Sequence, residues 1–141
     1  MSQVFTGRCY CGHVTVSAQA LQTVAYCHCA SCRRWTGGPV SAFAAFAPKD
    51  LTTDPPLGPP LSTVPGVERW SCPQCGSPIA ARFEYLPDQV YVPVGIMDQI
   101  DDLAPASHSH FGEKVTWLHM QDGLPREDES ARDVLSAAKP S

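Results

Sequence analysis

Residues 27–35 read CHCASCRRW, which places three cysteines, Cys27, Cys29 and Cys32, within six residues. Zinc takes four tetrahedral ligands: structural sites draw all four from the protein, whereas catalytic sites draw three and leave the last position to water or substrate. The stretch therefore predicts an open zinc site. The alternative is a closed site in which His28 or a distant histidine is the fourth ligand. In an extended segment, however, the His28 side chain would point away from the face that Cys27 and Cys29 share.

A second set of cysteines predicts a closed zinc site. Cys9 and Cys11 stand two residues apart, so in an extended segment their side chains face the same way. Cys72 and Cys75 form a knuckle of the Cys-x2-Cys type in the second half of the chain. Four thiolates from both halves would act as a cross-link, because their binding free energy exists only when the domain is folded. The alternative, a redox role for Cys72 and Cys75, lacks the strand-helix-strand pattern expected around such a pair.

The composition indicates a single folded domain that is mainly β. The chain has 141 residues, of which 43% are hydrophobic and 17% charged. Its 14 prolines and 10 glycines favour turns and short strands over long helices. The formal net charge is −4, and the only local basic feature is the Arg33–Arg34 pair, so we expect no nucleic-acid partner.

The cysteine count indicates the redox environment. Seven cysteines are an odd number, which argues against a complete disulfide framework. The first residues show neither the basic end nor the apolar run of a signal peptide, and no stretch approaches the length of a membrane-spanning helix. We therefore expect a cytoplasmic protein without a membrane partner, in which close-spaced cysteines indicate metal or redox chemistry.

Apolar runs predict several strands, which we place at residues 14–18, 40–46, 90–94 and 115–120. Gly12 permits the turn into the first of them. Pro93 favours an edge position for the third, because proline cannot donate a hydrogen bond to a neighbouring strand. Residues 54–65 carry five prolines and predict an extended surface loop. We expect one zinc domain over residues 1–125, followed by a polar tail over 126–141 that forms a short helix or frays.

Three motifs in this order and spacing carry a family resemblance: GRCYCG at 7–12, CHCASCRRWTG at 27–37 and RWSCPQCGS at 69–77. The chain resembles the glutathione-dependent formaldehyde-activating enzyme family, also called the CENP-V/GFA domain family. Asp98 and the run from His108 through Lys114 to Trp117 are similar to the family's C-terminal pattern.

The resemblance implies a zinc-containing fold of the Mss4-like type, with two small antiparallel sheets and few short helices. It also implies two zinc ions per chain. The structural zinc would be held by Cys9, Cys11, Cys72 and Cys75, and the catalytic zinc by Cys27, Cys29 and Cys32.

The chemistry of a three-thiolate site favours a sulfur substrate. Three thiolates leave a zinc ion with a formal charge of −1, which makes it a weaker Lewis acid for water than a three-histidine site. A soft site suits a sulfur ligand, and glutathione would supply one as a thiolate. Zinc would alternatively polarise an aldehyde oxygen, and the sequence leaves both roles open.

Together with this chemistry, the family resemblance implies a zinc-dependent carbon–sulfur lyase similar to S-(hydroxymethyl)glutathione synthase. It would act on the adduct of glutathione, or a related thiol, with formaldehyde or another small aldehyde. The alternative is a non-catalytic zinc module that binds a protein or a thiol metabolite.

Three further side chains are candidates for the site. Arg33 and Arg34 suit the carboxylates of glutathione, although they would equally offset thiolate charge or extend into solvent. His108 is the candidate for proton transfer because imidazole titrates near neutral pH, and a structural or surface role is its alternative.

Overall fold

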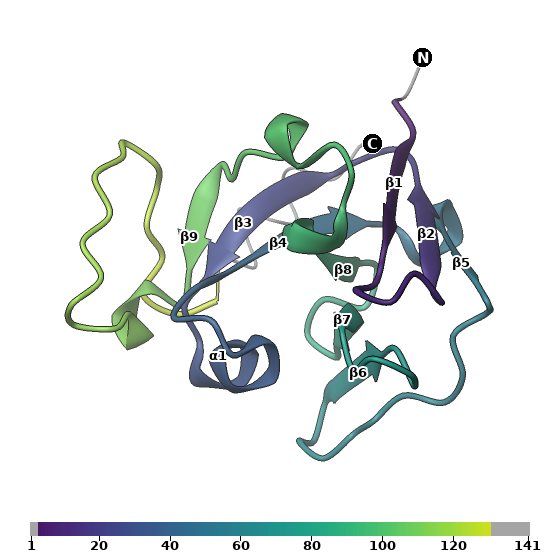
Figure 1. Ribbon diagram of the computed structural model, residues 1–141. Helices are drawn as coiled ribbons and strands as arrows, with labels where there is room; N and C mark the ends of the chain where they lie inside the picture. The colour runs from purple at the N-terminus through teal and green to yellow at the C-terminus, as the bar shows by residue number, and fades with distance from the viewer. Residues whose placement is uncertain (1–2, 131–141) are drawn as a thin grey trace.

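The computed structural model describes residues 3–130, and the strands in this part form two sheets (Figure 1). The smaller sheet has the order β1-β2-β5, with β1 at Phe5–Arg8, β2 at Thr15–Ala18 and β5 at Leu51–Asp54. The larger sheet has the order β6-β7-β8-β4-β3-β9. Its strands span Val67–Ser71 (β6), Pro78–Phe83 (β7), Val90–Pro93 (β8), Ser41–Phe46 (β4), Thr23–Cys27 (β3) and Ser107–Ser109 (β9). Every strand pair is antiparallel except β3 and β9, which run parallel.

Helical structure is short within the described residues. The α-helix α1 spans Ala30–Thr36, and the 3₁₀ turns are η1 (Pro48–Asp50), η2 (Val94–Ile96), η3 (Ile100–Asp102) and η4 (Phe111–Glu113). The predicted mainly β fold with two sheets and few short helices is confirmed.

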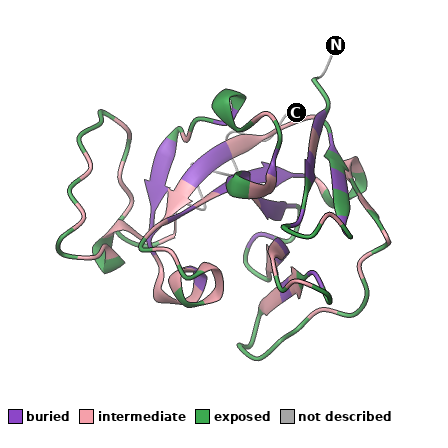
Figure 2. Ribbon diagram, viewed as in Figure 1, coloured by how far each residue is buried: buried purple, intermediate pink, exposed green. Residues whose placement is uncertain are grey.

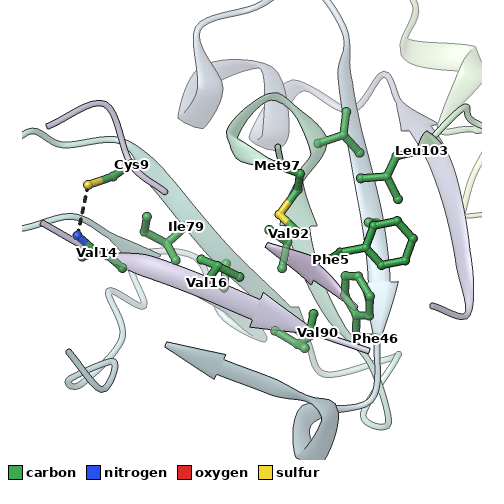
Figure 3. Packing of buried hydrophobic residues seen from close by; sticks show 14 of the residues in the cluster. Phe5, Cys9, Val14, Val16, Phe46, Ile79, Val90, Val92, Met97 and Leu103 are labelled. Atoms are coloured by element: carbon green, nitrogen blue, oxygen red, sulfur yellow. Dashed lines mark hydrogen bonds between the residues drawn. The ribbon is translucent and has the colours of Figure 1, made fainter. Parts of the chain in front are cut away.

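The larger sheet carries apolar side chains on both faces. On one face, Phe46 and Val92 pack with Phe5 and Val16 of the smaller sheet to form the main core (Figure 3). On the other face, Phe43 packs in a second cluster that contains Cys32 of α1. Successive residues of a strand alternate between faces, so a strand covered on both sides is apolar throughout. This explains why residues 41–46 form a continuous apolar run after Ser41 that is mostly buried (Figure 2).

Two of the predicted strands fit the structure and two need correction. Residues 14–18 and 40–46 correspond to β2 and β4. Residues 90–94 contain β8, but the predicted edge position is wrong, since β8 lies between β7 and β4. Pro93 is tolerated there because it is the last residue of the strand, opposite Phe43, and the chain then turns into η2.

The strand predicted at residues 115–120 is wrong. These residues belong to a loop that projects beyond β9 (Figure 1), with Trp117 65% exposed. The outer side of β9 is already used, because His108 N donates to Pro125 O and Glu127 N donates to His108 O. An apolar run needs a partner strand to join a sheet, and the described residues leave this run without one.

The remaining chain-level predictions concern the loop and the tail. The loop predicted at residues 54–65 corresponds to the mostly exposed connection between β5 and β6, residues 55–66, since Asp54 is the last residue of β5. Arg126 of the expected tail forms an isolated bridge with His108, so this segment begins packed on β9. The predicted helix or frayed end lies largely on residues 131–141, outside the described residues.

Candidate metal centres

The first cluster joins the two sheets. The Sγ atoms of Cys9, Cys11, Cys72 and Cys75 all lie within 4.8 Å of one another. Cys9 and Cys11 follow β1 in the turn toward β2, whereas the other pair forms the knuckle between β6 and β7. Gly12 and Gly76 have φ values of +82° and +79°, a backbone region that glycine adopts without steric cost. The predicted group of four thiols is thus assembled from distant parts of the chain, in the arrangement that a cross-linking metal would need.

Neutral donors surround these sulfurs. Val14 N donates to Cys9 Sγ at 3.2 Å (Figure 3), and Gln74 N donates to Cys72 Sγ at 3.4 Å. The Cys75 Sγ and Ser77 Oγ atoms lie 3.1 Å apart. Such hydrogen bonds orient the sulfurs and lower the cost of their negative charge.

The second cluster forms where β3 passes into α1. Cys27 ends β3, and Cys29 is the N-cap of α1, where its Sγ accepts a hydrogen bond from Cys32 N at 3.3 Å. Cys32 is fully buried in the first turn of the helix, and its Sγ lies 3.5 Å from Cys27 Sγ. The three sulfurs lie within 4.8 Å of one another. The passage from β3 into the short helix therefore brings the three predicted thiols together in one cluster.

The donor set of the second cluster fits a soft divalent metal ion. The pKa of Cys27 lies far above the ordinary value of a thiol. The largest cause is its hydrogen bond with Cys29, and the next is its hydrogen bond with Cys32. The converse hydrogen bond from Cys27 is the main cause that lowers the pKa of Cys29 to about 2. Three adjacent thiols thus cannot all ionise by themselves. A cation such as zinc would stabilise all three thiolates at once.

His28 takes no part in the three-cysteine group. Its side chain is fully buried, and its Nε2 atom lies 2.8 Å from His108 Nδ1. Within residues 3–130, the cluster contains three Cys, His, Asp or Glu ligand atoms and no fourth. This arrangement matches the orientation expected for an extended Cys27–Cys29 segment.

A small pocket of about 40 Å³ opens onto the three cysteines. Aromatic and aliphatic side chains form much of its wall, including Phe83, Tyr85, Leu86 and Tyr91. Burial raises the pKa of Tyr85 to about 12 and raises that of Tyr91 further, so both phenols stay protonated near neutral pH. The pocket is large enough for a molecule of only a few heavy atoms.

His110, rather than His108, lines this pocket. His110 is a non-glycine residue with a positive φ of 54°, and its Nδ1 lies 3.4 Å from Glu113 Oε2. Glu113 also accepts a hydrogen bond from Ala30 N at the start of α1. An unusual backbone conformation next to a cluster of reactive groups is typical of functional sites. Sequence reasoning missed His110 because no spacing rule separates it from the other histidines.

His108 is fully buried and lies against His28 of the metal loop, the segment of residues 27–32 that carries the three cysteines. Its Nε2 lies 3.0 Å from Asp122 Oδ2, and its ring stacks on Tyr26 with a centroid distance of 4.8 Å. Phe111 contacts the same ring edge-on at 5.4 Å. These contacts hold β9 against β3 and against the loop that follows β9.

The two predicted arginines lie beside the cysteine pocket and are not among the residues that line it. Arg34 is exposed and lines a neighbouring groove of about 300 Å³ together with Ser31 and Trp35. Arg33 is half-buried, and its Nε atom is buried without a hydrogen-bond partner in the described part of the chain. The arginine that contacts a cluster sulfur is instead Arg69, whose Nη2 lies 3.7 Å from Cys32 Sγ. That contact spans 37 residues, so local spacing gave no signal for it.

Together, the fold and the two clusters define a β-rich protein of the metal-binding class, with a four-cysteine and a three-cysteine centre. The chain belongs to the glutathione-dependent formaldehyde-activating enzyme (GFA) family, whose sequence profile matches residues 4–113. The family's name describes an enzyme that acts on formaldehyde in the presence of glutathione.

The comparison with solved structures supports the fold. The chain is similar to the crystal structure of a Rhodobacter sphaeroides protein, with 20% identity and a TM-score of 0.53. The match covers 86% of this chain and 99% of that chain. Comparison with curated proteins gave no significant match. Among residues 3–130, no helix has both the length and the apolar character needed to cross a membrane.

Proposed function

We propose that this chain is a zinc-dependent carbon–sulfur lyase. It makes or breaks the adduct of glutathione, or a related thiol, with formaldehyde or another small aldehyde. The observation that carries the proposal is the three-cysteine cluster, which has three ligand atoms within residues 3–130 and faces a small pocket. Family membership supports formaldehyde and glutathione as the first substrates to test.

In the forward direction, the thiol sulfur attacks the aldehyde carbon and a carbon–sulfur bond forms. The thiol proton ends on the former carbonyl oxygen, so the product is a hydroxymethyl thioether. The reverse reaction breaks the same bond and returns the proton to sulfur. No electrons are transferred to or from a third reactant, and one proton acceptor near the sulfur suffices.

The two cysteine clusters divide the metal roles in this proposal. Cys27, Cys29 and Cys32 would hold the catalytic zinc, whereas the four-cysteine cluster would hold the structural one. A zinc ion in the catalytic position would bind the substrate sulfur as a thiolate or polarise the aldehyde oxygen.

The pocket residues supply selectivity and proton transfer. The wall that contains Phe83 and Leu86 excludes bulk water and leaves room for a small aldehyde. His110 lines the pocket, with Glu113 beside its Nδ1, and is placed to accept or return the thiol proton. His108, buried between His28 and Asp122, would act indirectly by holding the metal loop in place.

Arg33 and Arg34 would bind the carboxylates of the thiol substrate. Arg34 lines a groove together with Arg69, which contacts Cys32 Sγ. Arginine pairs with carboxylates through two parallel hydrogen bonds, which orients the ligand as well as binding it. We place the reaction in the cytoplasm, because all seven cysteines are free thiols and such thiols persist in a reducing compartment.

The test is the rate of exchange between free and adduct-bound formaldehyde at equilibrium. Formaldehyde and thiols combine unaided, so the amount of product proves nothing, whereas a catalyst must accelerate both directions. NMR exchange spectroscopy with and without the zinc-loaded chain measures this rate. We expect acceleration that is lost in Cys27→Ser and in Cys32→Ser while the zinc of the first cluster remains bound. Wild-type protein that fails to accelerate exchange would rule out this reaction and leave another thiol adduct or a binding module.

A further inference from the structure

Arg69 is a buried cation beside the three-cysteine cluster. It lies in β6 and is 8% exposed. Its Nη2 atom donates to Ser31 Oγ at 2.9 Å and lies 3.7 Å from Cys32 Sγ, within the range of a hydrogen bond to sulfur. Within residues 3–130 no carboxylate forms an ion pair with this guanidinium. A buried charge without a carboxylate needs another source of negative charge, and the nearest one is the cysteine cluster.

Aromatic rings hold the guanidinium in this position. Its Cζ atom lies 4.6 Å from the Trp35 ring centroid and 5.5 Å from that of Phe83. Trp35 and Ser31 both belong to α1, the helix that also carries Cys32. The orientation of Arg69 is therefore fixed by the same helix whose sulfur it contacts.

The two clusters differ in the charge of their hydrogen-bond donors, because Arg69 donates to the second cluster and neutral groups donate to the first. Three thiolates around a divalent ion give a net charge of −1, and the Arg69 charge of +1 brings the buried group to zero. In the first cluster the donors described above are backbone N–H groups and a hydroxyl, for example Val14 N to Cys9 Sγ. A hydrogen bond from a cation withdraws more electron density from a thiolate than one from a neutral amide.

We infer that Arg69 is a positioning residue of the three-cysteine metal site, which acts through Cys32. It offsets the surplus negative charge of the three thiolates, raises their affinity for a metal ion, and weakens electron donation from Cys32 so that the bound ion stays electrophilic. This inference rests on the metal site of the proposed function but not on the reaction. It is therefore tested by metal binding and not by activity.

The experiment uses the full chain loaded with Co²⁺, whose thiolate-to-metal absorption reports the donor strength of the sulfurs. Arg69→Met removes the charge and keeps an unbranched side chain. We expect about a 10- to 100-fold weaker affinity for the second ion, the loss typical of groups that hold metal ligands. We also expect the absorption of that site to shift to longer wavelength, with the first site unchanged. Arg69→Lys, which keeps the charge, should recover part of the affinity.

Arg82→Met is the matched control. Arg82 lies in the adjacent strand β7, and its Nη2 donates to Pro87 O at 3.1 Å, so its loss should leave both metal sites unchanged. If Arg69→Met fails to fold, Ser31→Ala takes its place, because it removes only the hydroxyl that orients Nη2. A smaller shift in the same direction is then expected.

Two outcomes would overturn the inference, and they are distinguishable. A wild-type chain that binds a single ion would remove the three-cysteine metal site, and the proposed function with it. A chain that binds two ions, with affinity and absorption unchanged in folded Arg69→Met or in Ser31→Ala, would overturn the role of Arg69 alone.

Discussion

His28 Nε2 lies 2.8 Å from His108 Nδ1, and both imidazoles are completely buried. His28 stands between Cys27 and Cys29, whereas His108 lies in β9. One hydrogen bond therefore connects the metal loop to the sheet edge. Because each neutral ring carries one N–H, one histidine donates and the other accepts, which fixes a pair of tautomers.

Asp122 extends this pair toward the surface. Its carboxylate lies 3.0 Å from His108 Nε2 and also contacts Arg126. Partial burial opposes ionisation, but hydrogen bonds from Leu124 N and His108 outweigh it and lower the pKa of Asp122. A carboxylate at one end favours a proton on His108 Nε2, so His108 Nδ1 is then the acceptor and His28 the donor. The chain of groups anchors the projecting loop to the metal loop.

We predict that His28 stays neutral well below neutral pH. Burial, followed by the charges of His108 and Lys114, lowers its pKa from 6.5 to about 4. Between these values the unfolded chain binds more protons than the folded one. The stability that depends on a neutral His28 is therefore fully present above about pH 6.5. As the pH falls toward 4, the free energy of unfolding decreases by up to about 3 kcal/mol. The ring proton shifts of His28 in an NMR titration measure this directly.

Urea unfolding at several pH values gives the independent check. His28→Gln should flatten the dependence of stability on pH between 6.5 and 4, whereas the matched variant His119→Gln, at an exposed position, should not. Excess zinc in all samples limits loss of metal through protonation of the cysteines. Equal slopes in wild type and His28→Gln would contradict the assignment.

The two metal sites should differ in their importance for folding. Cys72→Ser removes a thiolate from the cluster that joins the two sheets, so we expect the fold to be lost or severely destabilised. Cys29→Ser removes a ligand from the local cluster at the start of α1, so we expect one metal ion to be lost while the fold remains. Metal analysis combined with circular dichroism measures both effects. Equal unfolding of the two variants would argue against a structural and a catalytic site.

The cysteine groups could be predicted from the sequence because ligand spacing is local. Cys27, Cys29 and Cys32 lie within one turn and its flank, and the knuckle at Cys72 has a fixed pattern. The same local logic predicted β2 and β4. It was wrong for Pro93, because proline interrupts pairing only where a donor is needed, and a strand end needs none.

Features that depend on distant packing could not be predicted in this way. Residues 115–120 form an apolar run like that of a strand, yet the outer side of β9 is filled by residues 125–127. The turn at His110 brings that residue to the cysteine pocket, whereas His108, two residues earlier, is buried elsewhere. Whether a segment joins a sheet, and whether a side chain faces a pocket, depends on residues that are distant in sequence and close in space. A single sequence does not reveal those contacts.

The main core should be far less tolerant of truncation than the projecting loop. Phe46 is completely buried between the two sheets, and Phe46→Ala should cost about 3–5 kcal/mol through lost contacts and the cavity left behind. Trp117→Ala, an aromatic truncation at a position 65% exposed, should change stability by less than about 0.5 kcal/mol. Denaturant unfolding of the zinc-loaded proteins compares them. A large loss at Trp117 would mean that the loop is covered by a partner or a second copy.

The last prediction concerns recognition of the thiol by the two arginines. If Arg33 and Arg34 bind carboxylates, their removal should weaken glutathione more than a small neutral thiol such as 2-mercaptoethanol. Arg33 is half-buried and its Nε is shielded from water, so Arg33→Ala should raise the KM for glutathione about 10- to 100-fold, as expected for a charge-assisted hydrogen bond. Arg34 is exposed, and the effect of its removal should be smaller, about two- to fivefold, and weaker at high salt.

Exchange rates measured over a range of concentrations of each thiol show whether the arginines bind carboxylates. Arg8→Ala, at an exposed arginine on β1, is the control. Equal losses for glutathione and the neutral thiol would mean that these arginines act on the metal site or the fold. No loss for either thiol would place the carboxylate contacts elsewhere. A loss confined to glutathione, larger for Arg33→Ala than for Arg34→Ala, is the outcome that their burial predicts, since a charge-assisted hydrogen bond shielded from water contributes more than an exposed ion pair.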